Sequence, residues 1–543
     1  MTERETISKK ILENIEHKKI LRQKIWFQFN GILHESNVGV IFHGGLSIAA
    51  KIIEENLVGK NVTVIGGFTT LSYQIQVACF LAKIRFIALD SEEQERFDFI
   101  DLIESEAVFL DETSIRSDFS LTLKNMIPVY RFGEKYPHLR MNITNSSESK
   151  KITFHGSFST SDFEKVKEVV DSTSSSDVAC FSTTSGSTGR PKIIQYANRM
   201  TFNPVFENDP KGVSGAVGLV KRFGRDFRYF LGEVAGALFI NFVTHMTHGL
   251  ICQFLRNEGR NILLADNNDI TNSLAAMKKL NCITAVMYLP KCLEIMESEA
   301  FRKIKPDSLL ILLITGTKVH PEHCQRIKSK FEQVLHRSPV ILKGYGSTEC
   351  SGFFVRHGIL TSEEVQFKTD GKFTISKEYE LRIVDENNND VRQGKIGEII
   401  VKTPDLMLGY KNHPKQEGWY RMGDEGFLDE FGNLNIVGRV KEQIILKSTK
   451  KSNCSLLEEK ILLSGCPIKE AVVLNRRNSD GYDDIIAILV CENFQAADII
   501  SKITSLLAAE IKDTPKVFCQ EKSFPKLASG KYDRRALFNK YFL

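Results

Sequence analysis

The chain has 543 residues and a mass of 61.5 kDa, which is long enough for about three or four structural units. Hydrophobic residues make up 42% of it and charged residues 26%, with a mean hydropathy of −0.17. These values fit a soluble globular protein and exclude a disordered chain, a fibrous repeat and a protein with many membrane spans.

The net charge of +5 is unevenly placed along the chain. Residues 441–543 contain 17 Lys and Arg against 13 Asp and Glu, so +4 of the total lies there. This excess is smaller than a nucleic-acid-binding domain requires, and we expect no nucleic-acid partner. It suits a small anionic ligand or an acidic protein partner, although on charge alone an ordinary solvated surface is the simpler explanation.

Three features predict a reduced, cytoplasmic protein. The N-terminus, MTERETISKK, is charged from its third residue and lacks the apolar centre of a signal peptide. The apolar stretch 309–314 is far too short to cross a bilayer. The 11 cysteines are scattered without a CxxC pair, so neither a zinc site nor a disulfide framework is predicted.

Short apolar strands alternate with helical patterns through the first part of the chain. A helix is predicted over 5–28, a strand over 61–65, a helix over 73–82 and a strand over 84–89. The same alternation returns in the segments 262–265, 273–280, 283–287 and 308–315. It predicts βαβ units, a largely parallel sheet and therefore an α/β fold.

The pattern changes at three places further along the chain. Residues 144–177 are rich in Ser, Thr and charge, and two pieces of this region, NSSESKK at 145–151 and DSTSSSD at 171–177, are expected to be exposed connectors. From about residue 370, short strands with Gly and Asn turns predict a β-rich subdomain. After Gly438, helical and strand patterns return at 456–463, 470–474, 485–490 and 496–511. We therefore predict a large N-terminal domain over 1–439 and a small, separate α+β domain over 440–543.

The most informative segment is the loop FSTTSGSTGRPK at residues 181–192. Its glycines permit close backbone approach, its hydroxyls and amides can surround phosphate oxygens, and its lysine adds a compact positive charge. It is not a Walker A motif, because Pro191 intervenes and strand-like segments flank it on both sides. A flexible surface loop would share the Ser and Gly content but not this order of residues between two strands. The residues predicted to bind phosphate are Thr184, Ser185, Gly186, Ser187, Thr188, Gly189 and Lys192.

This loop resembles the phosphate-binding signature of the AMP-forming adenylating enzymes, which include acyl-CoA synthetases, luciferases and nonribosomal-peptide adenylation domains. Four further segments match that family's pattern in the same order along the chain. They are GYGSTE at 344–349, GWYRMGD at 418–424, IVGRVK at 436–441 and PKLASGKYDRR at 525–535. The five motifs span roughly residues 176–535, whereas residues 1–150 match the family only loosely.

The resemblance implies a site for ATP. Tyr345 would stack on adenine, and Asp424 would accept hydrogen bonds from both ribose hydroxyls, with Arg439 nearby. Taken alone, Arg439 is equally well explained as a surface ion-pair partner. The other residues that the family pattern assigns to the nucleotide are Gly316, Gly346, Ser347 and Ile436.

The resemblance also implies a magnesium ion and a catalytic lysine. Thr348 would contact the α-phosphate and Glu349 would hold Mg²⁺, since a carboxylate suits a hard cation that bridges phosphate oxygens. Lys531 would bridge the substrate carboxylate and the α-phosphate, and so offset the repulsion between two anions. An exposed basic tail is the alternative for Lys531, and only its position in the motif argues against it.

Lys441 stands where the family places a hinge between its large and small domains. A hinge residue absorbs a large change in backbone dihedral angles while one domain rotates. In this family the rotation would take the catalytic lysine away before a pantetheine thiol reaches the adenylate.

The sequence departs from the family pattern around the acid and the acceptor. Glu233 falls where many members carry His or Phe, so it lies either outside the pocket or against a cationic or hydroxylated substrate. The Asp of an F-D-x-S context, which binds amino groups, is absent, so an α-amino acid is not the first choice. Residues 446–458 lack the Gly-containing loop and the P-x-E-I-E segment of thioester-forming members, which leaves the acceptor open.

Two histidine groups are weaker candidates. His245 and His248 form HxxH without a third ligand, and metal binding is not expected there. His320 and His323 with Cys324 resemble a metal cluster only superficially. The PEHC segment is instead predicted to start a helix with Pro321 in its first turn.

The predicted function is that of a stand-alone AMP-forming acid–thiol ligase, with no fused carrier domain. It would activate a small carboxylic acid as an acyl-adenylate with ATP and Mg²⁺, and pass the acyl group to CoA or to a carrier protein's phosphopantetheine thiol. Two alternatives stay open. One is an amino-acid-activating, adenylate-only or oxidative member with another acceptor, and the other is a degenerate nucleotide-binding regulator.

Overall fold

The computed structural model describes most of the chain and leaves several segments undescribed. The described residues are 5–17, 22–29, 31–91, 97–115, 119–133, 142–144, 149–152, 158–184, 192–200, 236–239, 248–252, 255, 261–316, 318–359, 380–430, 434–448, 451–491, 496–520, 523–525 and 532–543. Within these ranges, no helix is both long and apolar enough to reach across a bilayer.

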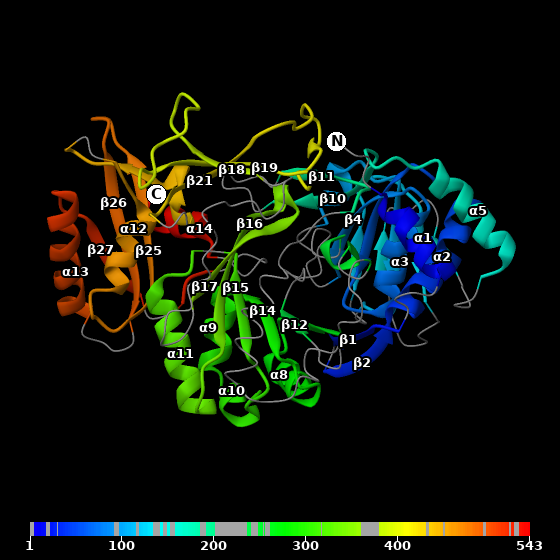
Figure 1. The fold of residues 1–543 in the computed structure, drawn as a ribbon, viewed down its shortest axis with the longest axis horizontal. Coiled ribbons are helices and arrows are strands. Elements are labelled where there is room, and N and C mark those ends of the chain that lie inside the picture. Colours follow the sequence, from blue (N-terminus) through cyan, green and yellow to red (C-terminus); the bar gives the residue numbers. More distant parts are fainter. Residues whose placement is uncertain are drawn as a thin grey trace.

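Two eight-stranded sheets form the larger part of the molecule (Figure 1). The first has the order β17 (Gly352–Ile359), β16 (Val340–Ser347), β15 (Ile311–Thr315), β14 (Thr284–Tyr288), β12 (Gly236–Phe239), β13 (Ile262–Ala265), β1 (Lys24–Phe29) and β2 (Ile32–Asn37). The second has the order β20 (Gly409–Tyr410), β11 (Ile193–Ala197), β10 (Val178–Thr183), β4 (Arg85–Asp90), β3 (Asn61–Gly66), β5 (Ala107–Asp111), β7 (Val129–Phe132) and β9 (Ser149–Ile152). Both are parallel in their interior, and antiparallel pairs occur only towards their edges.

Helices cover these sheets and fill the space between them. Helices α2 (Val38–Glu54) and α3 (Thr70–Leu81) share one apolar core with strands of both sheets. Around them lie α1 (Ile7–His17) and α5 (Thr160–Asp171). The outer face of the first sheet is covered by α8 (Ile270–Lys279), α9 (Leu289–Glu297), α10 (Glu299–Ile304) and α11 (Pro321–Leu335). The short elements α4 (Phe99–Leu102), β6 (Ser120–Thr122) and β8 (Asn142–Thr144) complete this region.

Strand β4 shows why these segments are almost continuously apolar. Phe86 and Ala88 belong to the core around α2 and α3, whereas Ile87 and Leu89 belong to a second core on the opposite face. Successive side chains of a strand point to opposite faces, and a parallel strand covered on both sides must be apolar at every position. This is the basis on which the alternation in the sequence predicted an α/β fold.

The rest of the chain forms smaller sheets, of which the C-terminal one lies at the end of the molecule opposite α5 (Figure 1). A four-stranded sheet contains β18 (Glu380–Val384), β19 (Gly397–Lys402), β21 (Tyr420–Leu428) and β22 (Leu434–Arg439). A two-stranded sheet, β23 (Gln443–Ile445) and β24 (Lys451–Asn453), precedes helix α12 (Cys454–Leu462). The last sheet, β25 (Ile468–Arg477), β26 (Asp483–Cys491) and β27 (Lys516–Gln520), lies between α12 and α13 (Ala496–Ile511) on one face and α14 (Arg534–Phe542) on the other.

The structure corrects the prediction of one helix over 5–28. Helix α1 ends at His17, and residues 24–29 form strand β1, which pairs with β13 and β2. The side chains of Ile25 and Phe27 enter the core around α2, while Trp26 packs on the opposite face. An alternating pattern of this kind is that of a strand buried on both faces.

The connector expected at 145–151 is wrong in its last three residues, and the region 144–177 contains more regular structure than the two expected connectors imply. This region contains β9 and the helix α5, which begins with a capping box between Ser159 and Asp162. Residues 172–177 do form the turn between α5 and β10. The strand and helix patterns predicted for residues 61–89, 262–315 and 456–511 are confirmed, with ends shifted by a few residues.

Glycines allow α2 and α3 to approach each other closely. A Cβ atom placed on Gly44 would lie 2.2 Å from Nε2 of Gln74, and one on Gly45 would lie 2.4 Å from Cγ1 of Val77. Real Cβ atoms do not come this close to other atoms. At Gly45 the short, branched side chain of Val77 leaves no room for a side chain, whereas at Gly44 the end of the flexible Gln74 side chain would have to move.

This contact predicts a destabilising effect of Gly45→Ala. In a helix this substitution normally stabilises by about 0.5–1 kcal/mol, but here the added methyl group should separate α2 from α3 and destabilise the fold by about 1–3 kcal/mol. Thermal unfolding would measure the change. Gly249→Ala is the matched control, since a Cβ atom there would meet open space in a helical segment. A lower melting temperature for both variants would contradict the prediction that Gly45 is needed for close helix packing.

Candidate functional site

The site is built where strand β16 ends. The pairing of β16 with β17 shifts register between Tyr345 and Gly346, and a single 3-10 turn, η3 (Thr348–Cys350), follows. Two contacts hold this turn: the Tyr196 hydroxyl donates to the Thr348 carbonyl at 2.6 Å, and the Met407 amide donates to the Glu349 carbonyl at 2.7 Å. The segment 344–349, predicted as a nucleotide motif, is therefore a strand end fixed by residues of the second sheet and of the chain that follows it.

Tyr345, Asp424 and Arg439 form a connected group on one side of this strand end. The Tyr345 hydroxyl donates to Oδ2 of Asp424 at 2.7 Å, and Nε of Arg439 lies 3.2 Å from Oδ1 of the same carboxylate. Asp424 and Arg439 are direct partners in the antiparallel pair β21–β22. Burial and then the negative charge of Asp424 raise the pKa of Tyr345, so its hydroxyl stays protonated and remains a donor. The ion pair expected for Arg439 as the alternative thus exists, and its partner is the predicted ribose-binding carboxylate.

Glu349 and Lys192 belong to a second group of side chains, which meet at Tyr410. The Tyr410 hydroxyl donates to Oε1 of Glu349 at 2.9 Å, while Nζ of Lys192 stands 4.6 Å from the centre of the Tyr410 ring. Burial and then the charge of Glu349 raise the pKa of Tyr410 to about 12. Two of the chain's motifs, the phosphate loop and the segment 344–349, are thus joined through one tyrosine that neither motif contains.

The ends of the predicted phosphate loop also lie together. Strands β10 and β11 pair as an antiparallel hairpin, and the Thr184 amide donates to the Lys192 carbonyl at 3.0 Å. This confirms the strands expected on both sides of the loop. The predicted residues Ser185, Gly186, Ser187, Thr188 and Gly189 lie outside the described residues, so their positions stay predictions.

The remaining predicted nucleotide residues lie on neighbouring elements. Gly316 follows β15 with a φ of +87°, and the Thr315 hydroxyl before it points to the Gly344 carbonyl at 3.5 Å. Ile436 of β22 packs against the same small core as Tyr345. Gly346 and Ser347 belong to β16 itself. The catalytic residue predicted at Lys531, like Glu233, lies outside the described residues.

Sequence reasoning missed Tyr410, Tyr196 and Tyr420. The Tyr420 hydroxyl is 3.4 Å from that of Tyr410, and Tyr420 already stood in the GWYRMGD motif, which could have identified it. Tyr196 lies on the strand after the phosphate loop. The sequence there is that of an ordinary buried strand, so nothing in it marks Tyr196 as functional. Tyr410 follows Gly409 at the end of an apolar segment, and only its pairing with β11 brings it to the site.

Lys441 lies in a short 3-10 turn, η4 (Val440–Glu442), between β22 and β23. Next to it, a cluster of charges connects elements before and after this turn. Nζ of Lys318 lies 3.1 Å from the Val437 carbonyl and 3.1 Å from Oε2 of Glu459 in α12, and the buried His320 lies 3.5 Å from the same carboxylate oxygen. This cluster holds α12 against the start of α11, which begins at Pro321 as predicted.

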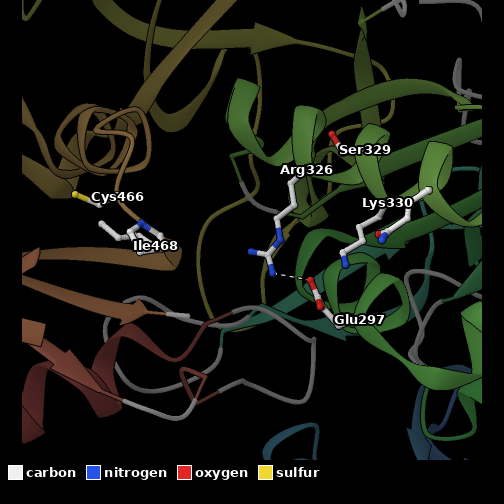
Figure 2. Close-up of a pocket in the computed structure, with 8 residues that line it drawn as sticks. Glu297, Arg326, Ser329, Lys330, Cys466 and Ile468 are labelled. Carbon is white, nitrogen blue, oxygen red and sulfur yellow. Dashed lines mark hydrogen bonds and ion pairs between the residues drawn. The ribbon is translucent and has the colours of Figure 1, made fainter. Parts of the chain in front are cut away.

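A cavity of about 430 Å³ lies away from these motifs, between α11 and β25 (Figure 2). Figure 2 shows Arg326 between Glu297 on one side and Ile468 and Cys466 on the other. Arg326 pairs with Glu297 at 2.7 Å and donates to the Lys469 carbonyl at 3.2 Å. No residue predicted for the site lines this cavity, so we place the candidate site at the end of β16.

The donor set at this strand end fits a nucleotide and a hard metal ion. Glu349 is half-buried, and within the described part of the chain hydrogen bonds reach its Oε1 but not its Oε2. A carboxylate oxygen of this kind suits Mg²⁺ shared with phosphate oxygens. By contrast, no group of three metal-binding side chains is found among the described residues, so an all-protein metal cage is not supported in that part.

Comparisons with known proteins agree with this reading. The family model described as AMP-binding enzyme matches residues 84–411. The chain is similar to 4-coumarate–CoA ligase 1 of Glycine max, with 26% identity over 51% of this chain and 95% of that protein, and to 4-coumarate–CoA ligase 1 of Petroselinum crispum, with 25% identity over 69% and 67%. It also resembles the solved structure of the anthranilate CoA ligase AuaEII with anthranoyl-AMP, at a TM-score of 0.68 and 14% identity over 99% of this chain and 98% of that one. This likeness confirms the predicted fold class, and the family match confirms the resemblance found in the motifs.

The charge cluster around Glu459 predicts a pH-dependent contribution to stability. Contact with His320, followed by the charge of Lys318, lowers the pKa of Glu459 to about 2, and Lys343 also faces it. A carboxylate with a lowered pKa stabilises the fold above its ordinary pKa of about 4.3, and that stabilisation is lost as the pH falls towards 2. Glu459→Gln should therefore lower the melting temperature at pH 7, and the difference from wild type should shrink between pH 5 and pH 3.

Glu380→Gln serves as the control for this comparison. Glu380 pairs with Lys402 at 2.9 Å on an exposed strand, where an ion pair contributes little. If the difference in melting temperature between wild type and Glu459→Gln stayed constant from pH 7 to pH 3, the charge of this carboxylate would not stabilise the cluster.

Proposed function

Since the chain belongs to the family of AMP-binding enzymes, we propose that it activates a carboxylic acid with ATP and transfers the acyl group to a thiol. The observation that carries the proposal is a pair of side-chain groups that share the segment 344–349. Tyr345 and Arg439 both contact Asp424, and Glu349 and Lys192 both contact Tyr410. This arrangement offers an aromatic face and a carboxylate for a nucleoside beside a lysine and a second carboxylate for its phosphates. It supports an intact nucleotide site and so argues against a degenerate regulator.

In this proposal the nucleoside lies beside Tyr345. The Tyr345 ring would pack against adenine, and Gly316, Gly346 and Ile436 would lie around the base. Asp424 would accept hydrogen bonds from the ribose hydroxyls. Both oxygens of Asp424 are already engaged by Tyr345 and Arg439. The ribose would therefore exchange hydrogen bonds with these two groups as it binds.

The phosphates would lie between the loop 184–189 and Glu349. Lys192 and the loop amides would hold the β- and γ-phosphates, Ser347 would line the site, and Thr348 would contact the α-phosphate. Glu349 would hold Mg²⁺ through its open oxygen. The ion, when bound, would neutralise charge on the phosphate oxygens.

The proposed reaction has two steps. An oxygen of the substrate carboxylate bonds to the α-phosphorus, the bond from that phosphorus to the bridging oxygen breaks, and pyrophosphate leaves. Lys531 would bring the two anions together in this step. A thiol then attacks the acyl carbon, gives up its proton, and AMP leaves with the electron pair of the acyl–oxygen bond.

The acid, the acceptor and the compartment are also proposals. The relatives named for 4-coumarate and anthranilate support aromatic acids as the first compounds to test. A carrier protein with an acidic surface would suit the positive charge of residues 441–543, and CoA is the other acceptor. We also propose that the boundary between the two domains lies between residues 439 and 440 and that the protein is cytoplasmic.

The adenylation step predicts a large effect of Lys531→Ala. The variant should bind ATP nearly as well as wild type, but its rate of acid-dependent ATP–pyrophosphate exchange should fall by orders of magnitude. The reason is that the charge of Lys531 matters most when the substrate carboxylate and the α-phosphate approach each other. Exchange would be measured across a panel of aromatic, aliphatic and amino acids. Lys540→Ala, a change to an exposed lysine of α14, is the control, and near-normal exchange by folded Lys531→Ala would refute the assignment.

The transfer step predicts a selective effect of Lys441→Pro. Proline fixes φ near −65° and removes an N–H group, so it should hold the small domain in one orientation. We expect adenylation to persist and thioester formation to be lost, as measured by mass spectrometry with CoA and with candidate carrier proteins.

Lys441→Ala is the matched control, since it removes the side chain but leaves the backbone free. It should form thioester like wild type. Equal thioester yields from Lys441→Pro and wild type would rule out a hinge at this residue, and product with free CoA alone would exclude the preference for a carrier protein.

A further inference from the structure

We propose that Tyr410 is a positioning residue that fixes Glu349 and Lys192 relative to each other, so that the metal ion and the phosphates are held as one unit. This inference rests on the proposed function and adds to it a residue outside all five motifs.

The Tyr410 side chain contacts one group through its hydroxyl and another through its ring. Its hydroxyl donates to Oε1 of Glu349 at 2.9 Å, which directs Oε2 of that carboxylate away from the tyrosine. Its ring faces Nζ of Lys192 at 4.6 Å from the ring centre, within the range of a cation–π contact. The Tyr420 hydroxyl, 3.4 Å from that of Tyr410, lies beside the same donor.

The backbone around Tyr410 is held from both sides. The Leu408 amide donates to the Gln195 carbonyl and the Lys411 amide donates to the Ile193 carbonyl, each at 2.8 Å, so the segment continues the second sheet directly beside Lys192. On its other side, the Met407 amide binds the Glu349 carbonyl at 2.7 Å.

Gly409 permits this path. Its φ is +141°, and a Cβ atom there would lie 2.9 Å from the Pro414 carbonyl oxygen. A side chain at this position would therefore push the segment off the second sheet.

The two partners of Tyr410 come from different sheets. Glu349 follows β16 in the first sheet, whereas Lys192 precedes β11 in the second. Strand register within either sheet cannot fix the distance between these two side chains. Tyr410 contacts both of them. Loss of a hydrogen-bonded partner that orients a metal-binding carboxylate typically lowers metal affinity 10- to 100-fold.

The test measures metal binding directly. Mn²⁺ would replace Mg²⁺ in an EPR titration of the protein saturated with a non-hydrolysable ATP analogue. Tyr410→Phe keeps the ring and removes the hydroxyl, and it should weaken Mn²⁺ binding by about tenfold or more while metal-free nucleotide binding stays unchanged. Tyr410→Leu also removes the ring, and it should weaken metal-free nucleotide binding by a further two- to fivefold or so.

Two comparisons separate positioning from loss of structure. Tyr130→Phe removes another tyrosine hydroxyl that points to a glutamate, Glu55 at 3.5 Å, and should change neither binding constant. In a Glu349→Gln background, Tyr410→Phe should have little further effect on Mn²⁺ affinity, because the carboxylate that it positions is gone. Melting temperatures of all variants would report on folding.

The outcomes distinguish this inference from the proposed function. Wild-type Mn²⁺ affinity in Tyr410→Phe, or an equal loss in both backgrounds, would overturn the role of the hydroxyl. Nucleotide binding that is the same in Tyr410→Leu and Tyr410→Phe would overturn the role of the ring. A wild-type protein that binds nucleotide and Mn²⁺ but exchanges pyrophosphate with no acid would contradict the proposed function, while the metal affinities would still decide the role of Tyr410.

Discussion

The contact between α2 and α3 is the constraint on which the position of the site depends. These helices share one core with both eight-stranded sheets, and Gly44 and Gly45 let them meet without intervening side chains. Each sheet supplies one part of the site, Glu349 after β16 and Lys192 before β11. A shift between the helices would move one sheet against the other and alter the distance between these parts. Packing in a core with few voids therefore has a direct effect on the geometry of the site.

Tyrosine hydroxyls connect the elements at the site in a recurring way. Tyr345 donates to a carboxylate, Tyr410 donates to another, and Tyr196 donates to a backbone carbonyl. A neutral donor can satisfy a buried acceptor without the desolvation penalty of a second charge. Burial raises the pKa of all three hydroxyls, which keeps them protonated. Uncharged hydroxyls therefore hold several elements of the site together, beside the one ion pair between Arg439 and Asp424.

The sequence predicted the fold class and much of the site because both depend on local patterns. Apolar strands buried on both faces, such as 84–89, and the Gly-rich loop with its flanking strands can be recognised without knowledge of the fold. The helix predicted over 5–28 was wrong in its second half, because Trp26 and its neighbours pack on both faces of a strand only when β13 lies beside them. Tyr410 was missed for a similar reason. Its function depends on a pairing between residues more than 200 positions apart in sequence, and nothing in the chain around it signals that partner.

Lys318 has a consequence for the energetics of any rotation about Lys441. Its ammonium group binds the Val437 carbonyl, which lies before Lys441 in the chain, and the Glu459 carboxylate, which lies after it. A rotation about Lys441 would leave the first contact in place and break the second, as it would break the ion pair of Lys451 with Glu386. Ion pairs near the surface are therefore among the contacts that separate the two orientations. Added salt screens such a pair far more than it screens an apolar contact. The balance between the two orientations would then depend on ionic strength, and the protein would respond to its electrolyte as well as to its ligands.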